Sequence, residues 1–209
     1  GGAAGGKQAS ETAVETVRER VSTAGSGGAP SDGLLAGVLE ANRRIFTAAA
    51  GDSSLKGMGT TIVALLVEDD RTAVVLNVGD SRLYRLRGEA LEQLSTDHSF
   101  VADLLRRNDI SEDEARSHPY RHMLTRALGV AEEVRPDVSR VDLAVGDLYV
   151  LCSDGIYGMM PPERLDRIVR DNRHSAERVC RELVAAALGG GGRDNATVVA
   201  IRCAPESIS

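Results

Sequence analysis

Two runs of β-branched and aliphatic residues, Thr60 to Val67 and Thr72 to Val78, predict a pair of neighbouring β-strands. Only the polar residues 68–71 separate the two runs, as in a hairpin turn. The chain is therefore expected to contain an antiparallel sheet. Two further short strands, 83–86 and 90–94, are expected to continue it as an antiparallel meander.

The rest of the chain adds helices and a second hairpin. That hairpin is expected around Gly146 and Asp147. Apolar residues at helical spacing predict helices, with Ser31 or Asp32 as the cap of the second one and Pro161–Pro162 as the start of the third. The remaining strands are expected at 141–145, 148–152 and 196–203, and the helices at 8–21, 34–46, from 161 onward and 175–188. Antiparallel strands with helices grouped between them favour an α+β fold in which helical layers cover sheets.

Length and charge narrow the class of protein. The chain has 209 residues, which suits a single domain over 1–209. Lys and Arg number 25 against 31 Asp and Glu, a net charge of −6, and aromatic residues make up only 3%. Nucleic-acid binders usually carry a basic surplus and stacking aromatic side chains, so this composition argues against that class. No apolar stretch approaches the ~20 residues of a membrane span, and we expect a cytoplasmic protein.

Three aspartates share one setting. Asp80, Asp154 and Asp194 each stand at or near the end of a hydrophobic run, beside a glycine or another small residue. If the three carboxylates meet at one sheet rim, they repel each other unless a cation neutralises them, and oxygen ligands favour Mg²⁺ or Mn²⁺ over zinc. An isolated Asp-Gly pair is most often a turn, as at Asp32–Gly33, so the spacing alone leaves both interpretations open.

Ordered short segments carry more information than any one of these residues. Along nearly the whole chain they are similar to the motifs of the protein phosphatase 2C family, in its bacterial branch. The segments are 57–61 (Gly-Met-Gly-Thr-Thr), 77–82 (Asn-Val-Gly-Asp-Ser-Arg), 96–99 (Thr-Asp-His-Ser), 118–121 (His-Pro-Tyr-Arg), 124–129 (Leu-Thr-Arg-Ala-Leu-Gly), 152–155 (Cys-Ser-Asp-Gly) and 192–197 (Gly-Arg-Asp-Asn-Ala-Thr).

The resemblance implies an α-β-β-α sandwich, in which two antiparallel sheets are flanked by helix pairs. It also implies hydrolysis of phosphoserine and phosphothreonine by a metal-activated water, with two or possibly three Mg²⁺ or Mn²⁺ ions. By the same resemblance, Asp154 matches the central metal ligand and Asp194 its partner at the second metal. Asp80 matches the ligand of a third, weaker ion that it shares with Asp154. The residues assigned to supporting positions are Ser81, Gly155 and Asn195.

The segment from His98 to about His118 resembles the family's mobile flap, here placed at about 98–120. It is rich in charged residues and poor in aliphatic ones, so little apolar area is available to hold it against the main body. Histidines 98 and 118 are expected at its edges. Arg82, at a strand end, is interpreted as a salt-bridge partner rather than a residue that acts on the substrate.

The front of the chain departs from the family pattern. Gly1 and Gly2 look like the tail of the family's Asp-Gly-x-Gly-Gly motif, and by this resemblance they too are assigned to supporting positions. The metal-bridging Asp of that motif, and the strand before it, would precede Gly1. Residues 1–209 alone are therefore expected to be a poor enzyme.

The expected partners are a phosphoprotein substrate and the pathway of an opposing serine/threonine kinase, with no nucleic acid and a monomeric state. Two alternatives remain at this stage. One is a catalytically inactive relative that only binds phosphoproteins, against which the three aspartates argue. The other is a Mg²⁺-dependent phosphodiesterase or nuclease, which would need a basic groove.

Overall fold

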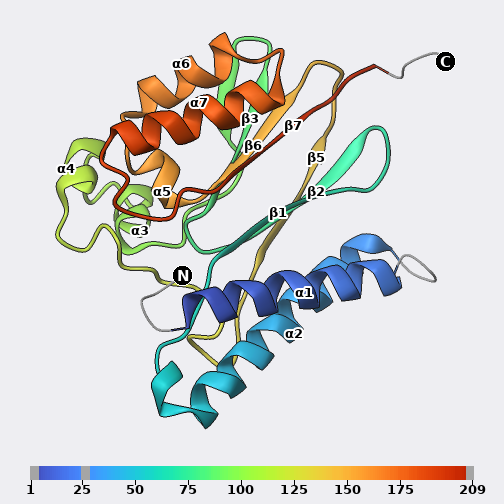
Figure 1. Ribbon diagram of the computed structural model, residues 1–209, viewed down its shortest axis with the longest axis vertical. Helices are drawn as coiled ribbons and strands as arrows, with labels where there is room; N and C mark the ends of the chain where they lie inside the picture. The colour runs from blue at the N-terminus through green and yellow to red at the C-terminus, as the bar shows by residue number, and fades with distance from the viewer. Residues whose placement is uncertain (1–4, 25–28, 206–209) are drawn as a thin grey trace.

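A computed structural model describes residues 5–24 and 29–205 of the chain, and Figure 1 shows its layers. A helix pair, two β-sheets and a second helix pair are stacked in that order. The first pair and the first sheet consist of α1 (Gly6–Ala24), α2 (Pro30–Gly51), β1 (Ile62–Val67), β2 (Thr72–Val78) and β5 (Asp137–Asp142). The predicted α-β-β-α sandwich is confirmed.

The second sheet has the order β4-β3-β6-β7, and all neighbouring strands in both sheets are antiparallel. Helices α6 and α7 lie over its outer face (Figure 1). The elements of this half are β3 (Arg82–Arg87), β4 (Ala90–Gln93), β6 (Leu148–Cys152), α5 (Asp154–Tyr157), α6 (Pro162–Asp171), α7 (Ala176–Gly189) and β7 (Val198–Arg202). Three short helices lie outside the layers: the 3-10 turn η1 (Ser53–Leu55), α3 (Phe100–Arg106) and α4 (Glu112–Ser117).

The hydrophobic core follows these layers. Val38 of α2 and Leu76 of β2 belong to the cluster between the first helix pair and its sheet. Leu183 of α7 and Val150 of β6 belong to the cluster on the other side. Between the two sheets, Tyr149 is fully buried with Val75 and Leu83. Burial of these apolar side chains is the main force that holds the sheets and helices together.

The predicted meander is wrong, because β2 and β3 belong to different sheets. The chain changes sheets at Gly79, where φ is +112°, a conformation that L side chains rarely adopt. A Cβ at Gly79 would lie 2.3 Å from Cγ2 of Thr61. This turn therefore requires glycine, and it places Asp80 where the chain crosses between the two sheets.

The predicted hairpin around Gly146 and Asp147 is wrong for a similar reason. Strand β5 pairs with β2, whereas β6 pairs with β3 and β7. The connection again uses a positive φ, +93° at Gly146. Asp147 is buried and accepts hydrogen bonds from Arg87 of the second sheet at 2.7 and 2.9 Å, which holds the crossing in place.

The helices lie where the apolar spacing predicts them, but the predicted cap of α2 is wrong. Helix α2 begins at Pro30 after Ala29, with no side-chain cap, so the prediction of Ser31 or Asp32 as the cap is wrong. A proline in the first turn gives up no hydrogen bond, which explains this start. In the described parts of the chain, no helix combines the length and apolar character that crossing a membrane requires.

Candidate metal centre

Asp80 lies in the turn between β2 and β3, and its surroundings oppose its negative charge. Burial, followed by the charges of Asp154 and then Asp97, raises the pKa of the Asp80 carboxyl to about 6. Asp154 is therefore close enough for its charge to act on Asp80, and both residues are partly buried. A cation there would favour the ionised form of both.

Asp154 is the first residue of α5, directly after the buried strand β6. One turn further along α5, the hydroxyl of Tyr157 donates to the backbone carbonyl of Asp80 at 2.9 Å. Burial, and after it the charge of Asp80, raises the pKa of Tyr157, so this hydroxyl stays protonated and remains a donor. Helix α5 thus carries one aspartate and fixes the backbone of the other.

Asp194 lies on the exposed loop between α7 and β7, and this loop is attached to the residue before Asp154. The hydroxyl of Ser153 donates to the carbonyl of Asn195 at 3.1 Å and accepts from the N–H of Thr197 at 3.1 Å. The N–H of Ser153 also donates to the carbonyl of Thr197 at 3.1 Å. The Asp194 carboxylate itself accepts from the N–H of Asn195 at 2.7 Å.

Gly155 allows this attachment to be close. A Cβ at position 155 would lie 2.3 Å from the carbonyl oxygen of Asn195. Ser81 points elsewhere, since its hydroxyl shares a hydrogen bond of 2.8 Å with that of Thr61. The predicted supporting glycines Gly1 and Gly2 lie outside the described residues.

The structure therefore brings the Asp154 segment into contact with both the Asp80 turn and the Asp194 loop. Within residues 5–24 and 29–205, no group of three or more His, Cys, Asp or Glu side chains is arranged to hold a metal ion. The metal-ligand roles of Asp80, Asp154 and Asp194 accordingly stay predictions. The donors present, carboxylates without His or Cys, are of the kind that Mg²⁺ and Mn²⁺ prefer.

Arg82 has the role that the sequence predicted for it. Its guanidinium donates to the carboxylate of Asp97 through Nε and Nη2, at 2.7 to 3.1 Å, and lies 3.7 Å from the centroid of the Tyr157 ring. The parts played by Asp97 and Tyr157 were not predicted from the sequence. For Asp97 the signal was available, because it stands inside the 96–99 motif.

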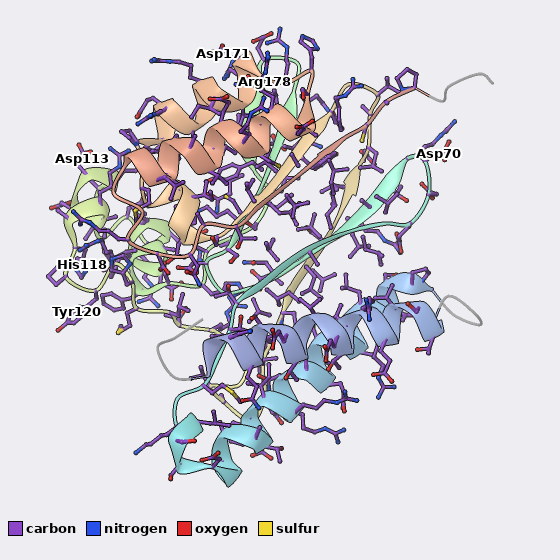
Figure 2. All side chains as sticks on the ribbon, in the orientation of Figure 1. Asp70, Asp113, His118, Tyr120, Asp171 and Arg178 are labelled. Atoms are coloured by element: carbon purple, nitrogen blue, oxygen red, sulfur yellow. The ribbon has the colours of Figure 1, made fainter. Side chains whose placement is uncertain are left out.

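The two flap histidines differ strongly in burial. His98 is 1% exposed, so it is an anchor at the base of the 98–120 segment rather than an exposed part of it. His118 is half-buried, and its ring centroid lies 5.7 Å from that of Phe100 and 5.8 Å from that of Tyr120 (Figure 2). Neither α3 nor α4 contributes a buried residue other than Ala115.

Solved structures resemble this arrangement closely. The serine/threonine phosphatase PstP/Ppp of Mycobacterium tuberculosis superposes with a TM-score of 0.85 at 33% identity, over 97% of this chain and 84% of that one. A catalytic domain of the serine/threonine protein phosphatase PstP, in complex with two manganese ions, gives a TM-score of 0.83 at 31% identity, over 96% of this chain and 82% of that one. The fold is thus that of the bacterial metal-dependent serine/threonine phosphatases.

Sequence comparison gives the family itself. The family described as protein phosphatase 2C matches residues 1–188. The serine/threonine phosphatase Stp of Listeria monocytogenes is 38% identical over 164 residues, which are 78% of this chain and 64% of that protein. The chain belongs to the protein phosphatase 2C family, and it spans less than two thirds of the length of this curated relative.

Proposed function

We propose that this protein hydrolyses phosphoserine and phosphothreonine esters in phosphoproteins. The observation that carries the proposal is the pairing of Asp80 with Asp154 at the crossing between the sheets, in a chain of the protein phosphatase 2C family. Burial and the charge of Asp154 raise the pKa of Asp80, an effect that a bound divalent cation would oppose. In the proposed site Asp154 and Asp194 would hold one ion, and Asp80 with Asp154 another.

Each residue has a defined part in this proposal. Bound Mg²⁺ or Mn²⁺ would supply an activated water and would polarise the phosphoryl oxygens. Asp154 would be a ligand of both ions, and the hydrogen bonds of Ser153, the residue before it, attach the Asp194 loop beside it. Tyr157 holds the carbonyl of Asp80 and thereby orients that turn.

The partners follow from the proposed reaction. Two of the relatives are named serine/threonine phosphatases and a third a protein phosphatase, and a phosphoprotein is accordingly the proposed substrate. An opposing serine/threonine kinase must supply it, because the substrate is the product of phosphoryl transfer to a hydroxyl. A monomeric state and a cytoplasmic location stay predictions.

The test is an assay of the full-length protein on phosphoserine and phosphothreonine peptides. We expect phosphate release with added Mn²⁺ or Mg²⁺ and none after the metal is removed with EDTA, with recovery when Mn²⁺ is restored. A phosphotyrosine peptide is the matched control and should be a poor substrate. Phosphate release that continues in EDTA would contradict the metal mechanism.

We also propose that the 98–120 segment is a mobile flap over the site. Its two helices bury little apolar area, and segments with few buried contacts open at low free-energy cost. Amide hydrogen exchange from Phe100 to Ser117 should be much faster than in β6, and it should slow when Mn²⁺ is added. Equal protection in the two segments, with or without Mn²⁺, would mean an ordinary helical insert.

A further inference from the structure

The short segment 96–99 connects the Asp80 turn to the end of the flap. The backbone N–H of His98 donates to the carbonyl of Gly79 at 3.0 Å. The carbonyl of His98 accepts from the N–H of Thr125 at 2.9 Å, just beyond the flap. His98 is therefore attached through its backbone to the turn on one side and to the returning chain on the other.

The side chain of His98 holds the same glycine a second time. Its Nδ1 accepts from the backbone N–H of Gly79 at 3.1 Å, so both polar backbone groups of Gly79 are bonded to His98. The ring is fully buried, and its Nε2 lies 3.1 Å from Oδ2 of Asp137 at the start of β5. Because Nδ1 is an acceptor, the ring proton resides on Nε2, which lies near that carboxylate but has no hydrogen-bond partner of good geometry among the described residues.

A separate contact holds the other side of the Asp80 turn. Asp97 binds Arg82, two residues after Asp80, through the bidentate ion pair described above. The segment 96–99 thus binds Gly79, the residue before Asp80, and Arg82, two residues after it. Asn77, at the end of β2, adds two hydrogen bonds: its Nδ2 donates to the carbonyls of Gly79 at 3.1 Å and Thr96 at 2.7 Å.

The turn needs these restraints because its own chemistry works against a single conformation. Gly79 has a wide choice of backbone angles in the absence of bonds to its N–H and C=O. Asp80 follows Gly79 directly, so the backbone angles of Gly79 set the direction in which the Asp80 carboxyl group points. Bonds to the flanking backbone keep such a group in place while no cation is bound.

We infer that His98 is a positioning residue for Asp80, whose Nδ1 fixes Gly79 and so keeps the Asp80 carboxylate beside Asp154 for the cation that they share. The inference rests on the proposed function, because it assumes that Asp80 is a ligand. It assigns to His98 no contact with the substrate or with the ion. The positioning of Asp80 depends on the Nδ1 atom. It does not depend on the packing of the ring or on the Nε2 contact to Asp137.

Two substitutions separate these possibilities in the full-length protein. In His98→Asn the side-chain amide can place an acceptor where Nδ1 was, whereas the contact to Asp137 is lost. In His98→Gln the amide can reach the place of Nε2, whereas the acceptor for Gly79 is lost. His174→Gln is the control, since this histidine is exposed on the connection between α6 and α7.

Three quantities are measured for each variant: Mn²⁺ affinity by calorimetry, hydrogen exchange of the Gly79 amide without metal, and stability in urea. We expect His98→Gln to bind the weaker Mn²⁺ ion about 10-fold less tightly or worse, as for other residues that orient a metal ligand. Its Gly79 amide should also lose protection. His98→Asn and the control should stay near wild type in both quantities.

Two outcomes would overturn the inference. If His98→Asn and His98→Gln lose Mn²⁺ affinity equally, in proportion to their loss of stability, His98 has a packing role only. Unchanged affinity in His98→Gln would mean that Nδ1 has no such role. The proposed function is judged separately, by phosphate release from the wild-type protein, so a failure of one is distinguishable from a failure of the other.

Discussion

Replacing Asp154 by Ala should remove nearly all phosphatase activity of the full-length protein, a loss of about 10³-fold or more. The reason is that Asp154 is proposed to touch more than one ion, and each bound cation stabilises the transition state by several kcal/mol. Initial rates on a phosphothreonine peptide at saturating Mn²⁺ measure the loss. Asp171→Ala is the matched control, because this residue is exposed at the end of α6, away from the site (Figure 2), and should keep wild-type rates.

The same position has a second readout that needs no substrate. The charge of Asp154 is one cause of the raised pKa of Asp80, after burial. In the metal-free protein, Asp154→Asn should therefore lower the pKa of the Asp80 carboxyl from about 6, with part of the increase remaining because burial is unchanged. Titration of the carboxyl carbon by NMR checks this. An Asp154→Ala protein that keeps more than a tenth of wild-type activity would contradict the central role of Asp154.

Most elements could be predicted from local sequence, because hydrophobic period and turn residues decide them locally. The strand 72–78, the helix 175–188 to within one residue, and the helix start at Pro162 are all confirmed. Sheet partners could not be predicted in the same way. The turn 68–71 and the turn at Gly79 are both short breaks between apolar runs, but the first keeps the chain in one sheet and the second moves it to the other.

In the candidate site, too, some features could be predicted from local sequence and others could not. Asp80 and Asp154 could be selected because each follows a hydrophobic run beside a small residue, and Asp194 because it stands in the 192–197 motif. The residues that hold them in place could not be predicted, since Tyr157 reaches Asp80 from a helix far along the chain and Ser153 reaches the Asp194 loop from the junction of β6 and α5. Such contacts depend on tertiary arrangement, and no local periodicity encodes them.

A single methyl group at Gly155 should damage the site by a different route. The new Cβ would lie 2.3 Å from the carbonyl oxygen of Asn195 and 2.8 Å from its carbonyl carbon. Both are backbone atoms, so no side-chain rotation relieves the clash, and the loop that carries Asp194 must move. We expect Gly155→Ala to cost about 1–3 kcal/mol of stability, as overpacking does elsewhere. Activity should fall about 100-fold, because small displacements of a catalytic group have large effects.

The comparison that isolates this cause is Gly189→Ala at the end of α7, where a Cβ would meet no atom within 4 Å. Alanine has the higher helix propensity, so this control should keep its activity and be as stable as wild type or slightly more stable. Urea unfolding and peptide assays at a temperature where both variants are folded give the two quantities. If Gly155→Ala loses activity only in proportion to its unfolded fraction, the Asp194 loop is not displaced and the clash is absorbed elsewhere. A large loss of rate in a folded protein, with weaker Mn²⁺ binding, would instead tie the close contact at Gly155 to the placement of Asp194.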